Sequence, residues 1–522
     1  MNNQTSNTCR SKKSIPGNAQ KEKGRVAAAT PGRYSGLVAA LLVAVILPGC
    51  ANYIGLGSDS KLTAAADLQN AKSLPAEHGN WPTADWANQF GDAQLAALIA
   101  EALKSSPTLA EARARLNAAA AFTEEARAQT LPKIGADYSY SRQQYSSTAL
   151  VPPPYAGSWQ SENKAVVSAA YDLDVWGKNS ESWKSSVSKL RVAEAEQEKV
   201  RLTVSAAVAG VYNELARLYA LRDLAVQEVG AWQDIGGITQ RRLRSGLDTE
   251  VEQQTVNRNL ASGKSALTAL DGRILDTRYQ LSALLGQGPD RGLAIARPDM
   301  SAGDTVQLPD NLPADLVARR PDLVAARWRV DALTHDIKVA KADFYPNINL
   351  GAAIGLDAFG FGRFLTAASR TANVGPAIHI PIFDAGALRA RLKERYADYD
   401  YAIAGYNGTL VSALTDVATQ LSRIRSGDAQ LVDAQAAEKA AARAYQLAGS
   451  QYRGGLTNQL NVLQARIGAL STEQAVVNLR MNRRSQQIAL AAALGGGFVA
   501  SQDTTTEQIA SNQTAASDKP AN

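Results

Sequence analysis

Four short stretches of this chain alternate apolar residues with small or polar ones, which is the period of a β-strand. Each stretch has about ten residues, the length of a tilted strand that crosses a bilayer. A half-buried strand of a soluble sheet shows the same alternation. The polar positions are mostly small rather than charged, and only four stretches occur, which favours membrane strands. The apolar positions are Ile134, Ala136, Tyr138 and Tyr140; Val167, Ala169, Tyr171 and Leu173; Ile348, Leu350, Ala352, Ile354 and Leu356; and Ala372, Val374, Ile378, Ile380 and Ile382.

Four strands are too few to close a barrel. Open sheet edges are not tolerated in lipid, and the smallest membrane barrels need about eight strands. If these strands span a membrane, several chains must therefore share one barrel. Three chains would supply about twelve strands.

Helical periodicity dominates the rest of the chain. Amphipathic helices are expected over residues 92–129 and 314–343, and each ends before a proline, because the residue before proline is biased towards extended backbone. Two uninterrupted helical stretches follow Gly177 and Gly386 and reach about Arg244 and Arg453. At ~1.5 Å per residue each is on the order of 100 Å long, so we expect coiled-coil packing rather than a globular core.

These elements occur twice in the same order. The copies lie too far apart for a solenoid repeat, so the chain is predicted to be one duplicated structural half. The copies differ by roughly five residues between their two alternating stretches, where a loop can absorb the change. The repeated marks are Pro107-Thr108-Leu109 with Pro321-Asp322-Leu323, Pro132 with Pro346, Gly177 with Gly386, Gly246-Leu247 with Gly455-Leu456, and Leu285-Gly286 with Leu494-Gly495.

The N-terminal segment is predicted to be a targeting signal. A basic stretch precedes the apolar run 37–47, which is too short to span a bilayer comfortably and is typical of a secretory signal peptide. The following Leu47-Pro48-Gly49-Cys50 resembles a bacterial lipobox, so Cys50 is the predicted lipidation site. The alternative is a plain signal peptide with an incidental cysteine. Removal of the leader would also remove Cys9 and leave no cysteine for a disulfide.

The formal net charge of +6 is concentrated in the leader. The remainder of the chain is close to neutral, so the positive charge is no argument for a nucleic-acid partner. The basic residues before Cys50 are Arg10, Lys12, Lys13, Lys21, Lys23, Arg25 and Arg33, against the single acid Glu22.

The predicted organisation follows from these boundaries. It comprises a signal peptide (1–49), a lipidated arm (50–91), a first repeat of helix, β-hairpin and long helical hairpin (92–286), a Pro- and Gly-rich linker (287–313), a second repeat (314–497) and a disordered tail (498–522).

Several junctions carry a family resemblance. They are Leu312-Pro313-Ala314-Asp315-Leu316, Arg319-Arg320-Pro321-Asp322-Leu323, Ala340-Lys341-Ala342-Asp343-Phe344-Tyr345-Pro346, the residues Trp86, Phe90, Asp92 and Leu95, and the tip Tyr452-Arg453-Gly454-Gly455-Leu456. With the duplicated plan and the lipobox, the chain resembles the outer-membrane factor family of TolC-like channels, in its NodT-type lipoprotein efflux branch. The resemblance covers about residues 47–497.

This resemblance implies a fold of mixed α and transmembrane β class. Long α-helical hairpins would form a periplasmic tube, and the four strands of each chain would share a barrel of about twelve strands in a homotrimer. The resemblance also implies a lipid-anchored, passive outer-membrane channel for small molecules. Its partners would be an inner-membrane pump, which supplies the energy, a periplasmic adaptor and outer-membrane lipid.

Both long helices end at a tip that contains glycine. Glycine suits the left-handed residue past a helix end, and Asp248 or Thr457 can cap the returning helix. The resemblance implies that the tips dock the adaptor. The plainer interpretation is that glycine ends the helix and leucine packs against it. The candidate docking residues are Arg244, Gly246, Leu247, Arg453, Gly455 and Leu456.

Asp234 and Arg443 occupy equivalent positions shortly before the two tips. The family closes its pore by polar contacts near the tips, so our hypothesis is that this pair joins neighbouring hairpins and holds the tube shut. Ala441 and Ala442 stand where the family's acidic ring is expected, which favours the alternative of an ordinary surface pair.

The sequence offers no catalytic constellation. The histidines at 78, 335 and 379 are scattered without metal-ligand spacing, and Gly360-Phe361-Gly362 lacks the frame of a phosphate loop. We therefore expect no enzyme, metal or cofactor. The aromatic loops 151–159 and 359–364 are expected to form an interfacial girdle or to constrict the mouth.

Two other functions stay open. One is an outer-membrane conduit for type I protein secretion, which sequence separates poorly from small-molecule efflux. The other is a lipidated periplasmic coiled-coil adaptor or scaffold. An adaptor would need one helical hairpin flanked by compact β domains, whereas this chain is predicted to have two hairpins and isolated strands.

Overall fold

The computed structural model describes residues 52–500, apart from residues 76, 149–150, 301–307 and 310–311. The predicted signal peptide, the lipidation candidate Cys50 and residues 501–522 of the predicted tail lie outside this part of the chain.

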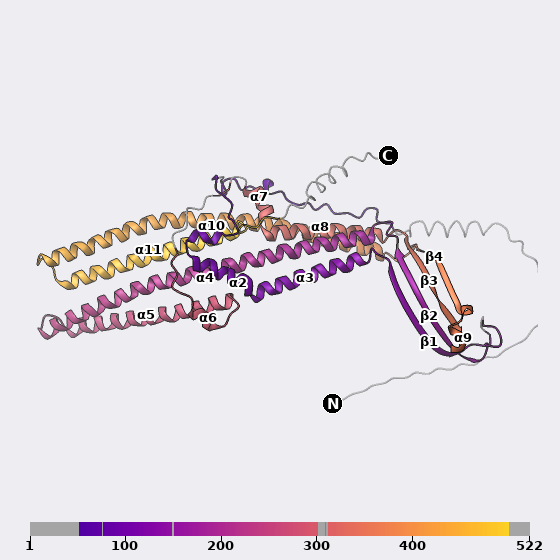
Figure 1. The fold of residues 1–522 in the computed structure, drawn as a ribbon. Coiled ribbons are helices and arrows are strands. Elements are labelled where there is room, and N and C mark those ends of the chain that lie inside the picture. The colour runs from indigo at the N-terminus through magenta and orange to yellow at the C-terminus, as the bar shows by residue number, and fades with distance from the viewer. Residues whose placement is uncertain (1–51, 76, 149–150, 301–307, 310–311, 501–522) are drawn as a thin grey trace, which may run out of the picture. The chain divides into compact units, whose positions relative to one another are not determined.

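The described chain contains the same set of elements twice (Figure 1). The first set is α2 (Ala93–Ser105), α3 (Pro107–Ala128), β1 (Lys133–Gln144), β2 (Trp159–Asp172), α4 (Lys178–Arg244) and α5 (Glu250–Leu284). The second set is α7 (Leu312–Arg319), α8 (Pro321–Ala342), β3 (Asn347–Phe359), β4 (Arg370–His379), α10 (Ala387–Arg453) and α11 (Gln459–Ala493). The short helices η2 (Ala65–Asp67) and η3 (Trp86–Phe90) precede the first set, and α6 (Pro289–Leu293) lies between the two sets. The short helices α9 (Phe361–Phe364) and η4 (Ala367–Ser369) lie between β3 and β4.

From Pro107 and Pro321 onward, corresponding helices of the two sets have equal lengths, although α2 has 13 residues and α7 has 8. α4 and α10 each have 67 residues, α5 and α11 each have 35, and α3 and α8 each have 22. The difference in length between the two copies therefore lies in the β-hairpins. The predicted duplication is confirmed.

The amphipathic helix predicted before each β-hairpin is broken in two, and the expectation of one continuous helix was wrong. Pro107 and Pro321 are the first residues of α3 and α8. The residues that precede them are extended, with ψ of 124° at Ser106 and 120° at Arg320. Proline lacks an N–H and disfavours helical backbone at the residue before it, so a new helix starts at each proline.

One contact explains why the Leu-Gly pair after each hairpin is repeated. Gly286 packs against the carbonyl of Ser105, and Gly495 packs against the carbonyl of Arg319. A Cβ atom would lie 2.4 Å from the Ser105 oxygen in the first copy and 1.9 Å from the Arg319 oxygen in the second. Only glycine fits there, so the end of each helical hairpin is joined to the helix break that precedes its own β-hairpin.

The four strands form one antiparallel sheet in the order β1-β2-β3-β4. The register places Ala136, Val167, Ile354 and Ala372 in one row across the sheet. The neighbouring row contains Gly135, Ser168, Ala353 and Asn373. Because side chains alternate along each strand, one face is apolar and the other is small and polar.

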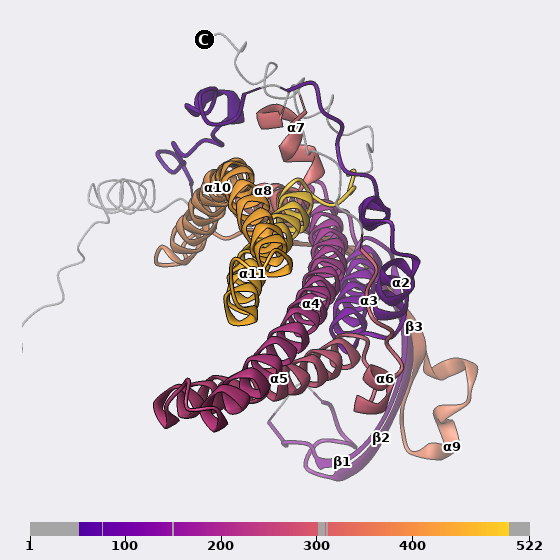
Figure 2. The ribbon, with the colours of Figure 1, turned by 90° about the vertical axis from the view of Figure 1, so that its left-hand side faces the viewer.

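Both long hairpins extend away from the sheet, and the view from their tips shows α4 with α5 and α10 with α11 as two pairs (Figures 1 and 2). α11 also packs against α4 and joins the two pairs. One core lies among α2, α4, α5 and α11, around Tyr212 and Leu281. A second lies among α8, α10, α11 and the arm, around Leu323 and Leu410. None of the described helices has the length and apolarity that a membrane-spanning helix requires.

Candidate functional site

The first hairpin tip ends α4 with a glycine in the left-handed region. Gly246 has φ of 67°, and the Leu247 N–H donates to the Arg242 carbonyl at 2.9 Å. This 6→1 bond satisfies one of the last carbonyls of α4. The Leu247 side chain is 66% exposed, so it does not merely pack against its own helix.

The residue that caps α5 is Thr249, not Asp248 as predicted. The Thr249 hydroxyl accepts from the Val251 N–H, and the Glu252 carboxylate accepts from the Thr249 N–H, which forms a capping box. Asp248 instead accepts two bonds from Arg242, from Nε and Nη2, each at 2.9 Å. This hydrogen bonding lowers the pKa of the Asp248 carboxyl. The first tip is therefore held by a bidentate ion pair as well as by its caps.

The second tip repeats the backbone of the first. Gly455 has φ of 73°, and the Leu456 N–H donates to the Gln451 carbonyl at 2.8 Å. Asn458 caps α11 by accepting from the Asn461 N–H, so the predicted cap at Thr457 was wrong. In both copies the cap stands one residue later than predicted. Leu456 is 81% exposed.

The candidate docking residues therefore form two similar ends, each with an exposed leucine on a glycine turn. Arg244 and Arg453, the last residues of α4 and α10, are also exposed. Arg453 donates to the Ser450 hydroxyl of its own helix at 3.1 Å. The geometry leaves both arginines and both leucines accessible to a partner.

The candidate gate residues do not meet within one chain. Asp234 on α4 and Arg443 on α10 are both exposed, and Arg443 donates to Gln446 of its own helix at 3.3 Å. No ion pair joins Asp234 to Arg443 in the part of the chain that the structure describes. A pair between hairpins of neighbouring chains stays a prediction.

The apolar face of the sheet is exposed to an unusual degree. Ile134, Ile354 and Val374 are 77%, 64% and 86% exposed, respectively. β1 and β4 lie at the two edges, and every residue of both strands is exposed. An apolar face between two unpaired edges needs lipid on the face and further strands at the edges.

The two aromatic loops meet at the far end of the sheet. Phe359, the last residue of β3, packs against Tyr145 with ring centroids 5.2 Å apart and against Tyr155 at 5.0 Å. Tyr138 packs against Phe364 at 6.0 Å. Whether these rings line an interface or constrict the mouth stays a prediction.

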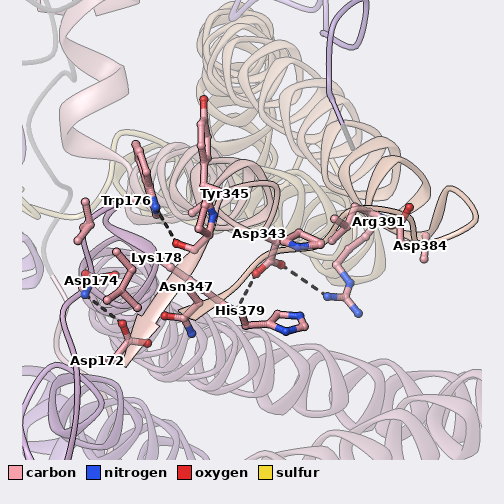
Figure 3. A pocket seen from close by; sticks show the side chains of 17 residues that line it. Asp172, Asp174, Trp176, Lys178, Asp343, Tyr345, Asn347, His379, Asp384 and Arg391 are labelled. Atoms are coloured by element: carbon pink, nitrogen blue, oxygen red, sulfur yellow. Dashed lines mark hydrogen bonds and ion pairs between the residues drawn. The ribbon is translucent and has the colours of Figure 1, made fainter. Parts of the chain in front are cut away.

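Sequence reasoning missed the junction between the sheet and the helices (Figure 3). Asp343, just after α8, binds Lys178 at 2.7 Å and Arg391 at 3.5 Å, so it links the first turns of α4 and α10. The Trp176 indole stacks on Tyr345 at 4.5 Å and donates to the Pro346 carbonyl at 2.8 Å. The position of Trp176 directly before the repeated Gly177 was the available signal. These contacts fix the direction in which the strands leave the helices.

A second polar cluster joins α4 to α8. The Glu181 carboxylate lies 2.7 Å from Lys184, 2.5 Å from His335 and 3.3 Å from Lys338. Burial alone would raise the pKa of Glu181, but the hydrogen bonds from Lys184 and His335 and the charge of Lys338 outweigh burial and lower that pKa to about 2. His335 therefore takes part in a contact between the repeats. The described residues contain no group of His, Cys, Asp and Glu that could hold a metal ion.

Comparisons with known proteins agree with this geometry. A model of the family described as outer membrane efflux protein matches residues 98–287 and 312–496. The chain is 35% identical over 366 residues to the fusaric acid resistance protein FusA of Burkholderia cepacia, which is 68% of each chain. The structure is similar to that of the outer membrane protein VceC of Vibrio cholerae, with 34% identity and a TM-score of 0.74 over 80% of this chain and 100% of that one. It is also similar to the outer-membrane channel OprN, with 26% identity and a TM-score of 0.75 over 85% of this chain and 99% of that one.

Proposed function

The chain belongs to the outer membrane efflux protein family, and we propose that it is the passive outer-membrane channel through which an inner-membrane pump and a periplasmic adaptor export small molecules. The family is one of channel proteins that work as trimers with efflux partners. We assign the chain no enzymatic role. The name of FusA, a resistance protein against a small molecule, supports efflux of small molecules over protein secretion.

This proposal rests mainly on the edges of the single chain. The sheet, the helices beside it and the helices towards the tips each end in an element without a neighbour on the same two sides of the chain. The sheet has β1 and β4 at its edges. Beside the sheet, α3 packs on α4, α4 on α8 and α8 on α10, which leaves α3 and α10 outermost. Towards the tips the order is α5, α4, α11, α10. Copies placed side by side can therefore continue the sheet and both helical layers at once, and three copies supply about twelve strands.

The path of the N-terminal arm supports a lipid anchor at Cys50. The Asn52 carbonyl accepts from Arg389 at 2.6 Å, near the start of α10, and Tyr53 packs against Phe344 with ring centroids 5.5 Å apart. The described arm thus begins beside the junction of sheet and helices, where the periplasmic membrane surface would lie. It then follows α10 towards Arg425, which pairs with Glu77. A Cys50→Ser variant should lose incorporation of labelled palmitate, and retained label would refute the assignment.

We assign adaptor docking to the two tips, because each presents an exposed leucine on a rigid glycine turn. Combined Leu247→Asp and Leu456→Asp should abolish export in cells and cross-linking to the adaptor while channel conductance is retained. Val432→Asp, at a residue that is 65% exposed and remote from the tips, is the matched control. Export that survives the double change would place docking elsewhere.

The decisive experiment combines conductance in planar bilayers with mass measurement of the detergent-solubilised complex. A conducting complex of three chains is the expected result. A monomer that does not conduct would defeat the proposal.

A further inference from the structure

Two matched helices, α4 of the first repeat and α8 of the second, form the seam between the repeats, which we call the α4–α8 seam. Polar pairs follow it over much of its length. Lys178 pairs with Asp343 at 2.7 Å, Ser188 donates to Asp331 at 2.6 Å, and Lys189 pairs with Asp336 at 3.0 Å. The Glu181 cluster and an ion pair between Glu196 and Arg329 complete the series.

An apolar cluster lies between these polar pairs. Val192 and Ala195 of α4 are buried against Val324 and Ala325 of α8, and Trp328 packs against this cluster. The bulky side chain at this point of the seam therefore belongs to α8, and the smaller side chains belong to α4.

Because the chain is duplicated, the helices of the α4–α8 seam have counterparts on the two open sides of the chain. α10 corresponds to α4, and both have 67 residues. α3 corresponds to α8, and both have 22 residues. Val192 and Tyr401 each stand fifteenth in their helices, and Trp328 and Ala114 each stand eighth. Two positions of the apolar cluster in the α4–α8 seam thus have counterparts on the two outermost helices.

Those counterparts are exposed in the single chain. Tyr401 is 83% exposed, and Ala397, Ala404 and Gly408 are small exposed residues near it on α10. Glu394, seven residues before Tyr401, is also exposed. On α3, Ala110 and Ala114 are exposed. The side-chain sizes at these positions are reversed relative to the α4–α8 seam. The bulky residue, Tyr401, belongs to α10, and the small residue, Ala114, belongs to α3. Complementarity between the two faces is thereby retained.

The polar pairs of the α4–α8 seam are absent at the corresponding positions. Glu181 and His335 correspond to Ala390 and Ala121, and Ser188 corresponds to Ala397. Lys189 and Asp336 correspond to Asp398 and Phe122, and Phe122 is 65% exposed. Alanine therefore replaces the charged or polar residue at three of these five positions, and no oppositely charged pair replaces Lys189 and Asp336.

We propose that α10 of one chain packs against α3 of a second copy, with the Tyr401 ring seated on Ala110 and Ala114 of that copy. The contact repeats the α4–α8 seam with its bulky residue moved to the other helix. This inference rests on the trimeric assembly of the proposed function. It identifies the residues that join the copies.

Cysteine cross-linking of the full chain in membranes tests the seam. Tyr401→Cys combined with Ala114→Cys should give, on oxidation, covalent trimers that a reductant returns to monomers. The matched control, Val192→Cys with Trp328→Cys, places the pair at the α4–α8 seam and should stay at monomer mass. If the wild-type complex is trimeric but the Tyr401/Ala114 variant stays monomeric, the seam is wrong. A monomeric wild-type complex would instead overturn the proposed function.

A size exchange gives an independent test. Ala114→Trp should lower the fraction of trimer at least tenfold, because the indole collides with Tyr401 of the neighbouring copy. Adding Tyr401→Val should restore the trimer, since it places valine and tryptophan between the copies at the positions that correspond to Val192 and Trp328 of the α4–α8 seam. Unchanged trimer in Ala114→Trp, or no recovery in the double variant, would overturn the proposal.

Discussion

At the scale of single residues, the positions that matter most are those where one atom decides whether two segments can meet. Gly286 and Gly495 lie against the carbonyls of Ser105 and Arg319, and both have positive φ. Ser105 also donates from its hydroxyl to the Leu285 carbonyl at 2.7 Å, and Arg320 donates to the Ala493 carbonyl at 3.2 Å. The repeated Leu-Gly and Pro marks are therefore two sides of one contact in each copy.

Gly495→Ala should destabilise the folded protein by more than backbone strain alone. Gly495 has φ of +95°, and its Cβ would lie 1.9 Å from the Arg319 oxygen, so the segment must shift. Gly386→Ala is the control, because Gly386 has φ of +88° and nothing within 4 Å of its Cβ position. Strain at such a φ costs about 1–3 kcal/mol, and Gly495→Ala should exceed this. Thermal unfolding in detergent measures both, and equal effects would contradict the clash.

The Glu181 cluster should make stability depend on acid pH. The folded pKa is lowered from 4.5 to about 2, so the stabilisation is fully present above pH 4.5 and is lost as the pH falls from 4.5 towards 2. Between pH 7 and pH 3 the melting temperature of the wild type should fall further than that of Glu181→Gln. Glu125→Gln, at an exposed glutamate on α3, should behave like the wild type. Equal losses in wild type and Glu181→Gln would show that other groups dominate.

At the scale of elements, the sheet is organised by its two faces. The register aligns the apolar positions of all four strands on one side, although the strands come from both repeats. A slip of one residue at any pairing would move a whole strand's apolar set to the polar side. Once the order of the strands is known, the alternation therefore restricts the register between neighbouring strands to those that keep the apolar residues on one face.

A charge on the apolar face should block assembly in the membrane. Ile354→Arg lies at the centre of that face, where an arginine near the bilayer midplane costs about 2–4 kcal/mol. Asn373→Arg, in the adjacent row on the polar face, is the matched control and should be tolerated. The yield of heat-modifiable trimer in outer membranes measures the effect. Equal yields of the two variants would mean that the apolar face does not contact lipid.

At the scale of the whole molecule, one chain provides a sheet and two helical layers, none of which closes into a ring. The sheet and both helical layers end at α3, α5, β1 on one side and at α10, β4 on the other. Closure of the sheet and of both helical layers is thus a property of the assembly.

If Asp234 and Arg443 hold the tips together, removing either charge should open the channel. Asp234→Ala and Arg443→Ala should each increase the open probability of single channels in planar bilayers. Exchanging the two charges, with Asp234→Arg and Arg443→Asp, should restore the closed state. Unchanged opening in Asp234→Ala would leave the two as ordinary surface residues.

Much of the fold could be predicted from the sequence, because its signals are local. Alternation defines the four strands, and long uninterrupted periodicity defines α4 and α10. Glycines in the left-handed region mark their ends. The repeated marks add the duplication and, with the strand count, the need for several copies. The tips were located correctly, but their caps were misplaced by one residue, because several neighbouring polar residues can each cap a helix.

Only the tertiary structure decided how these elements meet. Sequence patterns did not reveal that Gly286 and Gly495 hold the helix breaks, that Asp343 links α4 to α10, or that Asp248 pairs with Arg242. Each of these contacts joins residues whose partner is chosen by packing rather than by sequence spacing. The sequence by itself determined the elements and their duplication through local backbone preference and periodicity. The order of the layers and their open sides depends on long-range contacts, which no local pattern encodes.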